Sequence, residues 1–126
     1  MHETIQELLA DLGIQPEYTN ASLQNLGNAD SKYLRDLKLN VKAVLTSEHL
    51  SAKETNLLAL AVSTNNNKEI LSNAFAAKAK ENGATDAEIA DAQACASLFA
   101  ANNVFYRFRH YVEKDAYNNA PARLRM

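Results

Sequence analysis

One unbroken stretch decides the fold: residues 85–113 read TDAEIADAQACASLFAANNVFYRFRHYVE. Thr85 and Glu88 stand at the spacing of a capping box, in which each side chain accepts a hydrogen bond from the other residue's backbone N–H. No glycine or proline follows until Pro121, so the pattern predicts one helix from 86 to about 113, roughly 42 Å long at 1.5 Å per residue. A compact chain of this size has a radius of gyration of only about 14 Å. We therefore expect this long last helix to stand out from a lone monomer and to lie in a subunit interface.

The composition favours helices along the whole chain. Its 126 residues include 22 alanines and 14 asparagines, but only three glycines, two prolines and no tryptophan. Alanine is the best helix former, whereas a β-sandwich or barrel needs many β-branched residues and frequent turns. A hydrophobic fraction of 47% with a charged fraction of 22% excludes wholesale disorder. The sequence predicts a single all-α domain over 1–126.

The first third of the chain predicts two helices separated by a loop. Leucines and an isoleucine recur at helical spacing over residues 5–12, and Gly13 follows as a stop. Residues 14–29 look irregular, because they contain a proline, a glycine and several asparagines and serines. Asp30 is a good N-cap for the helix that follows.

A helical hairpin is predicted between residues 51 and 83. Ser51 and Glu54 form a second capping-box pair. The helix that they open reads LLALAV over 57–62, and because it is apolar nearly all round we expect it to be buried. It ends in the polar run 63–67, where an asparagine can cap the next helix, and Gly83 ends that helix.

Several features favour a cytoplasmic protein that does not enter a membrane. No apolar run approaches the roughly 18–20 residues that cross a bilayer. The first residues lack the basic and apolar segments of a signal peptide. Cys95 is the only cysteine, so no disulfide framework can form.

Charge is distributed unevenly along the chain. Residues 1–101 carry a net charge of −5, whereas residues 102–126 carry +3. Five basic side chains in the last segment are too few to support a nucleic-acid site, so we expect no nucleic-acid partner. We interpret the basic end as a contact with acidic surface elsewhere in an assembly.

Cys95 is one candidate for chemistry. A peroxidatic thiol needs a lowered pKa, which comes from a helix N-terminus, a nearby cation or a basic histidine. Cys95 lies in mid-helix among alanines with no cation close in sequence. We therefore favour a buried structural cysteine over a reactive one.

His110 is the second candidate, and two interpretations remain open. It could act as a general base beside two arginines that bind an anion. Alternatively, it ends an amphipathic helix that turns Phe105, Phe108 and Val112 inward, with the cations complementing the helix C-terminus; we favour this second interpretation. The sequence has no histidine, cysteine and carboxylate set at metal-ligand spacing and no glycine-rich phosphate loop, so we expect no metal and no cofactor.

Five segments carry a family resemblance. The run at 57–65, followed by a helix and by GATDAEI at 83–89, resembles the helical hairpin of the alkylhydroperoxidase D and carboxymuconolactone decarboxylase superfamily. DLKLN at 36–40, NNVFYR at 102–107 and ARLRM at 122–126 resemble, in order and spacing, the amino-terminal half of alkylhydroperoxidase D proteins. The resemblance covers residues 30–126 and leaves 1–29 as a variable amino-terminal region.

The resemblance implies an all-α, oligomeric helical bundle with a long last helix, built as one of two related halves. In such proteins the second half carries a Cys-x-x-Cys-x-x-x-His motif at a helix start and a glutamate one helix earlier. Counted back along the hairpin, these positions fall at Lys68, Leu71, Phe75 and Asn56. None carries the family's residue, and Glu54 lies two residues from the glutamate position, so the resemblance transfers no catalytic residue.

Two functions remain in view. The first is a non-catalytic half that serves structure and oligomerisation, with the long last helix forming a homo-oligomer. The second is a thiol-dependent alkyl hydroperoxide reductase, active only with a missing second half or through Cys95 and an external reductant. In that case a peroxiredoxin-system partner is implied, and Cys95, His110 and Glu54 are the weak catalytic candidates.

Overall fold

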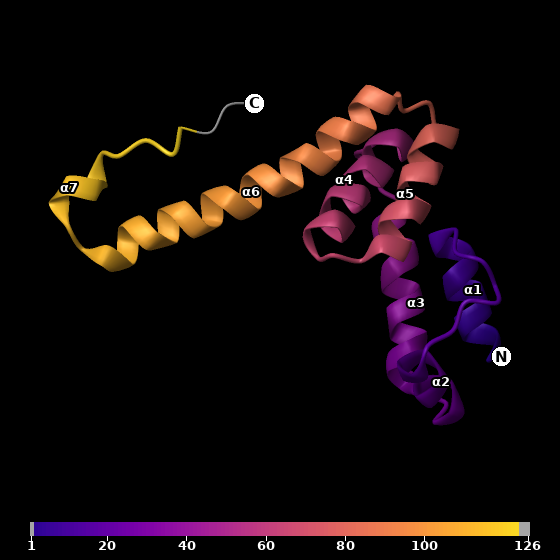
Figure 1. Ribbon diagram of the computed structural model, residues 1–126. Coiled ribbons are helices and arrows are strands. Elements are labelled where there is room, and N and C mark those ends of the chain that lie inside the picture. The colour runs from indigo at the N-terminus through magenta and orange to yellow at the C-terminus, as the bar shows by residue number, and fades with distance from the viewer. Residues whose placement is uncertain (1, 124–126) are drawn as a thin grey trace.

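The computed structural model describes residues 2–123, and these form an all-helical chain (Figure 1). The helices are, in order, α1 Glu3–Leu12, α2 Ala21–Asn28, α3 Lys32–Leu45, α4 Ala52–Asn65, α5 Glu69–Glu81, α6 Asp86–Val112 and α7 Asp115–Asn118. No strand occurs in this part of the chain, so the predicted all-α class is confirmed. The ARLRM segment at 122–126 lies partly outside the described residues. Within residues 2–123, no helix combines the length and the apolar character needed to cross a bilayer.

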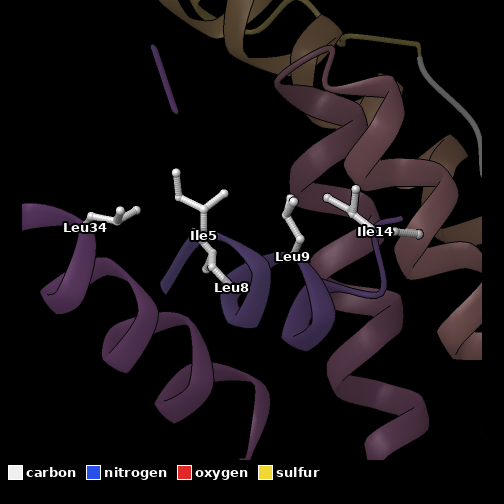
Figure 2. Packing of buried hydrophobic residues seen from close by; sticks show 6 residues of the cluster. Ile5, Leu8, Leu9, Ile14 and Leu34 are labelled. Carbon is white, nitrogen blue, oxygen red and sulfur yellow. The ribbon is translucent and has the colours of Figure 1, made fainter. Parts of the chain in front are cut away.

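The main hydrophobic cluster lies where α1 packs against α3 (Figure 2). The buried apolar residues of α1 are spaced three and four positions apart, so they lie on one side of the helix. Gly13 ends this helix in the left-handed conformation at φ 74°, as predicted. The cluster joins α1, the loop after it, α3 and α5 through Ile5, Leu8, Leu9, Ile14, Leu34 and Ala74.

The prediction of irregular structure over 14–29 is wrong, because α2 forms inside this segment. Asn20 caps α2, and its Oδ1 accepts a hydrogen bond from the backbone N–H of Leu23 at 2.9 Å. Gly27 lies within the helix and is buried. A Cβ at Gly27 would lie 2.9 Å from Cδ1 of Ile5, so this glycine permits close approach of α2 to α1 rather than breaking a helix.

Two predicted N-caps are also wrong. The N-cap of α3 is Ser31, while Asp30 adopts φ 44° and its Oδ1 lies 2.6 Å from Nη1 of Arg35. The Asp30 carboxylate, which was expected to cap α3, therefore pairs with Arg35 instead. The N-cap of α5 is Lys68 rather than an asparagine. Nδ2 of Asn66 donates at 2.9 Å to a carbonyl in the last turn of α4, so that side chain is turned back toward the preceding helix.

The second part of the molecule is organised around α4, which packs against both α5 and α6. The hydroxyl of Ser72 donates to Oγ of Ser63 at 3.0 Å and joins α5 to α4. The buried residues of α5 and α6 include Ala74, Ala79 and Ala96. Small side chains at a helix contact allow the two backbones to approach closely.

α6 is 27 residues long, or about 40 Å, which confirms the predicted long last helix. Its first half lies against the α4–α5 hairpin, and its distal half leaves the body of the molecule, where α7 is the one described helix that it contacts (Figure 1). The helix therefore stands out from the chain as expected. Its place in a subunit interface stays a prediction.

The expectation that α4 is buried on all sides is wrong. Leu60 is fully buried, but Leu58 and Val62 are each more than half exposed. The inward packing expected for Phe108 of α6 is not seen either, because about half of this side chain is exposed. Leu58 and Val62 lie on a face of α4 that the rest of the described chain leaves largely open, and Phe108 is covered only in part, by Tyr117 of α7.

Replacing Leu34 by alanine should lower the free energy of unfolding by about 2–5 kcal/mol, because this side chain fills the α1–α3 contact. Leu34 is 0% exposed. Leu39 lies on the same helix and is 64% exposed, so Leu39→Ala should change the free energy by no more than about 0.5 kcal/mol. Urea unfolding at one protein concentration measures both variants. Equal losses would contradict the assignment of this contact as the core.

Candidate functional site

An apolar groove of about 620 Å³ lies between α3 and α4, with further walls from α1 and α5. Its lining is mostly aliphatic, and includes Leu37, Val41 and Val44 of α3, Leu58 and Val62 of α4, and Leu71 of α5. Asn40, Thr55, Ser63, Asn66 and Lys68 add polar side chains around it. Clefts of this size and character are typical of binding sites in proteins, so the groove is the candidate functional site.

The groove lies at the hairpin positions that the family resemblance aligns with reactive residues. Lys68, Leu71 and Phe75 all line it. Asn56, at the glutamate position, is buried in α4 beside Thr55, which also lines the groove. The fold thus brings three of the four aligned positions to one groove, but none of the four carries a thiol, an imidazole or a carboxylate.

Two oxygens in the first turns of α4 lack hydrogen-bond partners among the described residues. They are Oγ1 of Thr55 and Oδ1 of Asn56, both buried. The other end of the Asn56 amide is satisfied, since Nδ2 donates to the backbone carbonyl of Ala52 at 2.8 Å. A buried polar group without a partner costs about 1–3 kcal/mol, so these two oxygens lower the stability of the start of α4.

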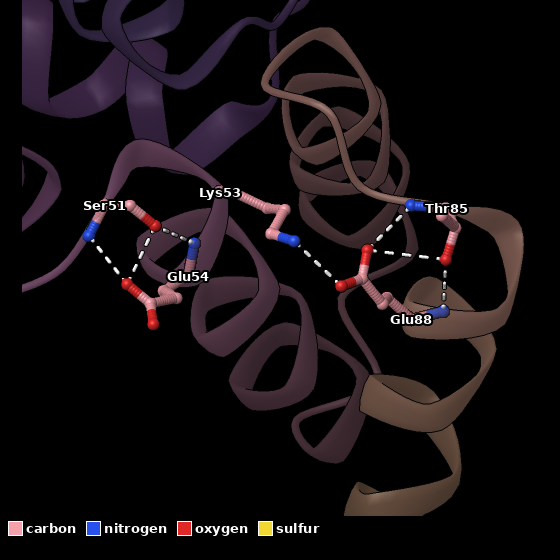
Figure 3. Close-up of polar contacts among 5 residues, drawn as sticks. All are labelled: Ser51, Lys53, Glu54, Thr85 and Glu88. Atoms are coloured by element: carbon pink, nitrogen blue, oxygen red, sulfur yellow. Dashed lines mark hydrogen bonds and ion pairs between the residues drawn. The ribbon is translucent and has the colours of Figure 1, made fainter.

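Glu54, a weak catalytic candidate, is occupied in capping α4 (Figure 3). Its Oε2 accepts from the backbone N–H and from the hydroxyl of Ser51, each at 2.8 Å. The Ser51 backbone hydrogen bond, followed by the hydroxyl hydrogen bond, lowers the pKa of Glu54 below its ordinary 4.5. The side chain is exposed. A carboxylate held ionised in a cap is a poor donor for a proton relay.

The capping box at the start of α6 is linked to α4 by an ion pair (Figure 3). Oε2 of Glu88 accepts from the backbone N–H of Thr85 at 2.8 Å, and its Oε1 lies 2.8 Å from Nζ of Lys53. The hydrogen bond from Lys53, followed by that from Thr85, lowers the pKa of Glu88 below 4.5. This contact joins the start of α4 to the start of α6.

Cys95 lies in α6 and is half-buried rather than fully buried as expected. It stands nine residues beyond the first residue of the helix. The electrostatic effect of a helix N-terminus falls off within the first turn, so the helix start does not activate this thiol. No group of three or more histidine, cysteine, aspartate or glutamate side chains among residues 2–123 is placed to hold a metal ion.

His110 is exposed near the end of α6 and packs edge-on against Tyr111, with ring centroids 5.3 Å apart. Its neighbour Arg109 lies over the rings of Phe105 and Tyr106, at 5.9 and 5.5 Å. Fifteen residues separate His110 from Cys95 on the same helix, which is roughly 22 Å along the axis. The structure therefore does not bring Cys95 and His110 into one site.

The groove itself was not predicted from the sequence. The sequence signal that could have indicated the groove was the spacing of Leu58 and Val62. These apolar residues lie one helical turn apart, and they were assigned to a buried helix. Sequence spacing reports that a face is apolar, but it does not report whether another element of the same chain covers it.

Comparison with known proteins gives one consistent result. Residues 32–114 match the carboxymuconolactone decarboxylase family. A protein named Alkyl hydroperoxide reductase AhpD from Anaeromyxobacter dehalogenans (strain 2CP-C) is 40% identical over 106 residues, which are 84% of this chain and 56% of the relative. A protein of the same name from Methylobacterium sp. (strain 4-46) is 35% identical over 94 residues, 75% of this chain and 53% of the relative. The chain thus spans about half the length of the curated relatives it matches. No solved structure gives a significant match.

Glu88→Gln should make the protein less stable at neutral pH, with the difference disappearing in acid. The folded-state pKa of Glu88 lies below the ordinary 4.5, so its contribution to stability is present above that value and is lost as the pH falls through the lowered pKa. Urea unfolding over a series of pH values measures the effect. Glu81→Gln, at the exposed end of α5, is the matched control and should show a smaller loss. A pH-independent loss in Glu88→Gln would contradict the role of the charge.

Proposed function

The chain belongs to the carboxymuconolactone decarboxylase family, and from this premise we propose that it is a non-catalytic, alkylhydroperoxidase D-like half that serves structure and self-association. The observation that carries the proposal is the apolar groove at the positions aligned with the family's reactive residues. Lys68, Leu71 and Phe75 line this groove, and none of them can perform thiol or imidazole chemistry.

The chemistry of peroxide reduction supports the same conclusion. A thiolate attacks one peroxide oxygen, the O–O bond breaks, and the sulfur becomes a sulfenic acid while the leaving oxygen takes up a proton. A second thiol then displaces water from the sulfenic acid and closes a disulfide. Cys95 is the only cysteine of this sequence, so the chain holds no resolving thiol for the second step.

The long α6 supports the structural role. Its distal half has no cover from the body of the molecule (Figure 1), and its last turns carry cations while residues 1–101 have a net charge of −5. We propose a homo-oligomer in which α6 contacts another copy. The lone cysteine suits the reducing environment of the cytoplasm, which we propose as the location.

A second function is favoured by a separate observation. The relatives are named alkyl hydroperoxide reductase, and Cys95 is only half-buried. Under this alternative, Cys95 would react with a peroxide and be restored by an external thiol, or a second half with its own cysteines would complete the enzyme. A peroxiredoxin-type protein would then be the partner.

The purified chain should not consume cumene hydroperoxide faster than buffer in the presence of a dithiol reductant. The physical reason is that Cys95 lies beyond the first turn of α6 and has no second thiol in the chain. Loss of peroxide is followed with and without protein, alongside Cys95→Ser as the matched variant and a full-length relative as positive control. Rapid turnover that disappears in Cys95→Ser would overturn the non-catalytic proposal.

A further inference from the structure

The chain exposes more surface than a compact protein of its mass. Its accessible surface is 8915 Å², whereas the size scaling of folded monomers gives about 6,700 Å² for 13.9 kDa. The excess of roughly 2,000 Å² is larger than the ~800 Å² that each partner buries in a standard protein–protein interface. Two apolar features contribute to this excess: the apolar groove and the distal half of α6.

The distal half of α6 carries an exposed stripe that we call the α6 stripe, formed by Val104, Phe108 and Tyr111. These residues are spaced at i, i+4 and i+7, so they lie on one face of the helix. The three side chains are each about half to three-quarters exposed. One edge of Phe108 packs against Tyr117 of α7, with ring centroids 5.5 Å apart. Val104 and Tyr111 remain largely exposed among residues 2–123.

The apolar groove matches the α6 stripe in character. Val44, Leu58 and Val62 line it and are each more than half exposed. A contiguous apolar surface of this kind on a small protein marks an interaction site. Recognition by an amphipathic helix that lays its apolar face into such a groove is a recurring mode of protein association.

The charged residues around the two surfaces also favour pairing of the apolar groove with the α6 stripe, and they indicate the orientation of the stripe in the groove. Glu48 and Glu54 are exposed around Leu50 at the α4-start end of the groove, and Lys68 stands at the other end of α4. Arg107 is exposed on the same helix as the α6 stripe and directly precedes Phe108 in sequence. Attraction between these groups sets Arg107 toward the glutamate end.

We infer that the α6 stripe of one copy of this chain packs into the apolar groove of a second copy. The distal half of α6 is held away from its own body (Figure 1), so the groove that it fills belongs to another molecule. This inference rests on the proposed self-associating function and deepens it, because it names both surfaces of the contact.

Opposite charges placed on the two surfaces test this contact. Val62→Lys in the groove and Val104→Glu in the stripe should each weaken self-association at least about tenfold, because each buries a charge without a partner. An equimolar mixture of the two variants should recover it, because the unaltered stripe of the Val62→Lys protein then enters the unaltered groove of the Val104→Glu protein, and the lysine groove meets the glutamate stripe. Sedimentation equilibrium over a range of concentrations measures all samples.

Matched controls place the same charges off the two surfaces. Ala77→Lys on α5 and Asn103→Glu on α6 are exposed positions outside the groove and the stripe, and they should leave the association constant unchanged. Circular dichroism checks that each variant keeps its helices. If a charged variant unfolds, Val62→Cys and Val104→Cys in the Cys95→Ser background replace it. A short bis-maleimide should then link one variant to the other in a mixture, and fail to link Ala77→Cys to Val104→Cys.

The outcomes separate this inference from the proposed function. Wild-type protein that stays monomeric at all concentrations would overturn both. Self-association that is weakened by Val104→Glu but unaffected by Val62→Lys would overturn the inference alone, because α6 helices would then pair with each other and leave the groove to another occupant. Loss in both single variants, with recovery in the mixture, supports it.

Discussion

Close contact between helices through small side chains is the constraint on which the rest of this fold depends. In the α4–α5–α6 part, alanines at 79 and 96 occupy buried positions, together with Leu60 and Phe75. An alanine side chain brings two helices near to each other but removes little apolar area from water, and burial contributes only about 25 cal/mol per Å². The large apolar side chains of the same helices, such as Leu58 and Val62, are left on the outer faces. The apolar groove lies beside this part of the fold, where large aliphatic side chains of α3 and α4 line its walls.

Local features of this fold could be predicted from the sequence, because neighbours in the chain determine them. The capping boxes at Ser51 and Thr85 and the stop at Gly13 each depend on residues within one helical turn, and all three form. Features that depend on tertiary contacts were missed. Asp30 does not cap α3, and its carboxylate pairs with Arg35 instead. Gly27 was expected in a loop, because nothing in the sequence indicates that Ile5 packs against it.

The candidate site was predictable in part. The family resemblance aligned Lys68, Leu71 and Phe75 with the positions of the family's reactive residues, and the structure brings these three residues to one groove. The opposite wall comes from α3, whose pairing with α4 no local pattern reports. The chemistry of the positions was evident from the residue types alone, since no thiol or imidazole stands at any of them. Burial could not be predicted, because an apolar helix face is buried only where a neighbour exists to cover it.

The unsupported distal half of α6 also has a consequence for backbone dynamics. An isolated helix of fewer than about 12–15 residues is marginal in water, since most helical stability in proteins comes from packing. Toward its C-terminal end, the backbone hydrogen bonds of α6 depend on the helix itself and, among the described residues, on packing against α7. Amide hydrogens there can exchange through fraying of the helix end, without opening of the α1–α3 core. Their exchange rates are therefore a local reporter of whether something covers this helix, separate from the global stability of the fold.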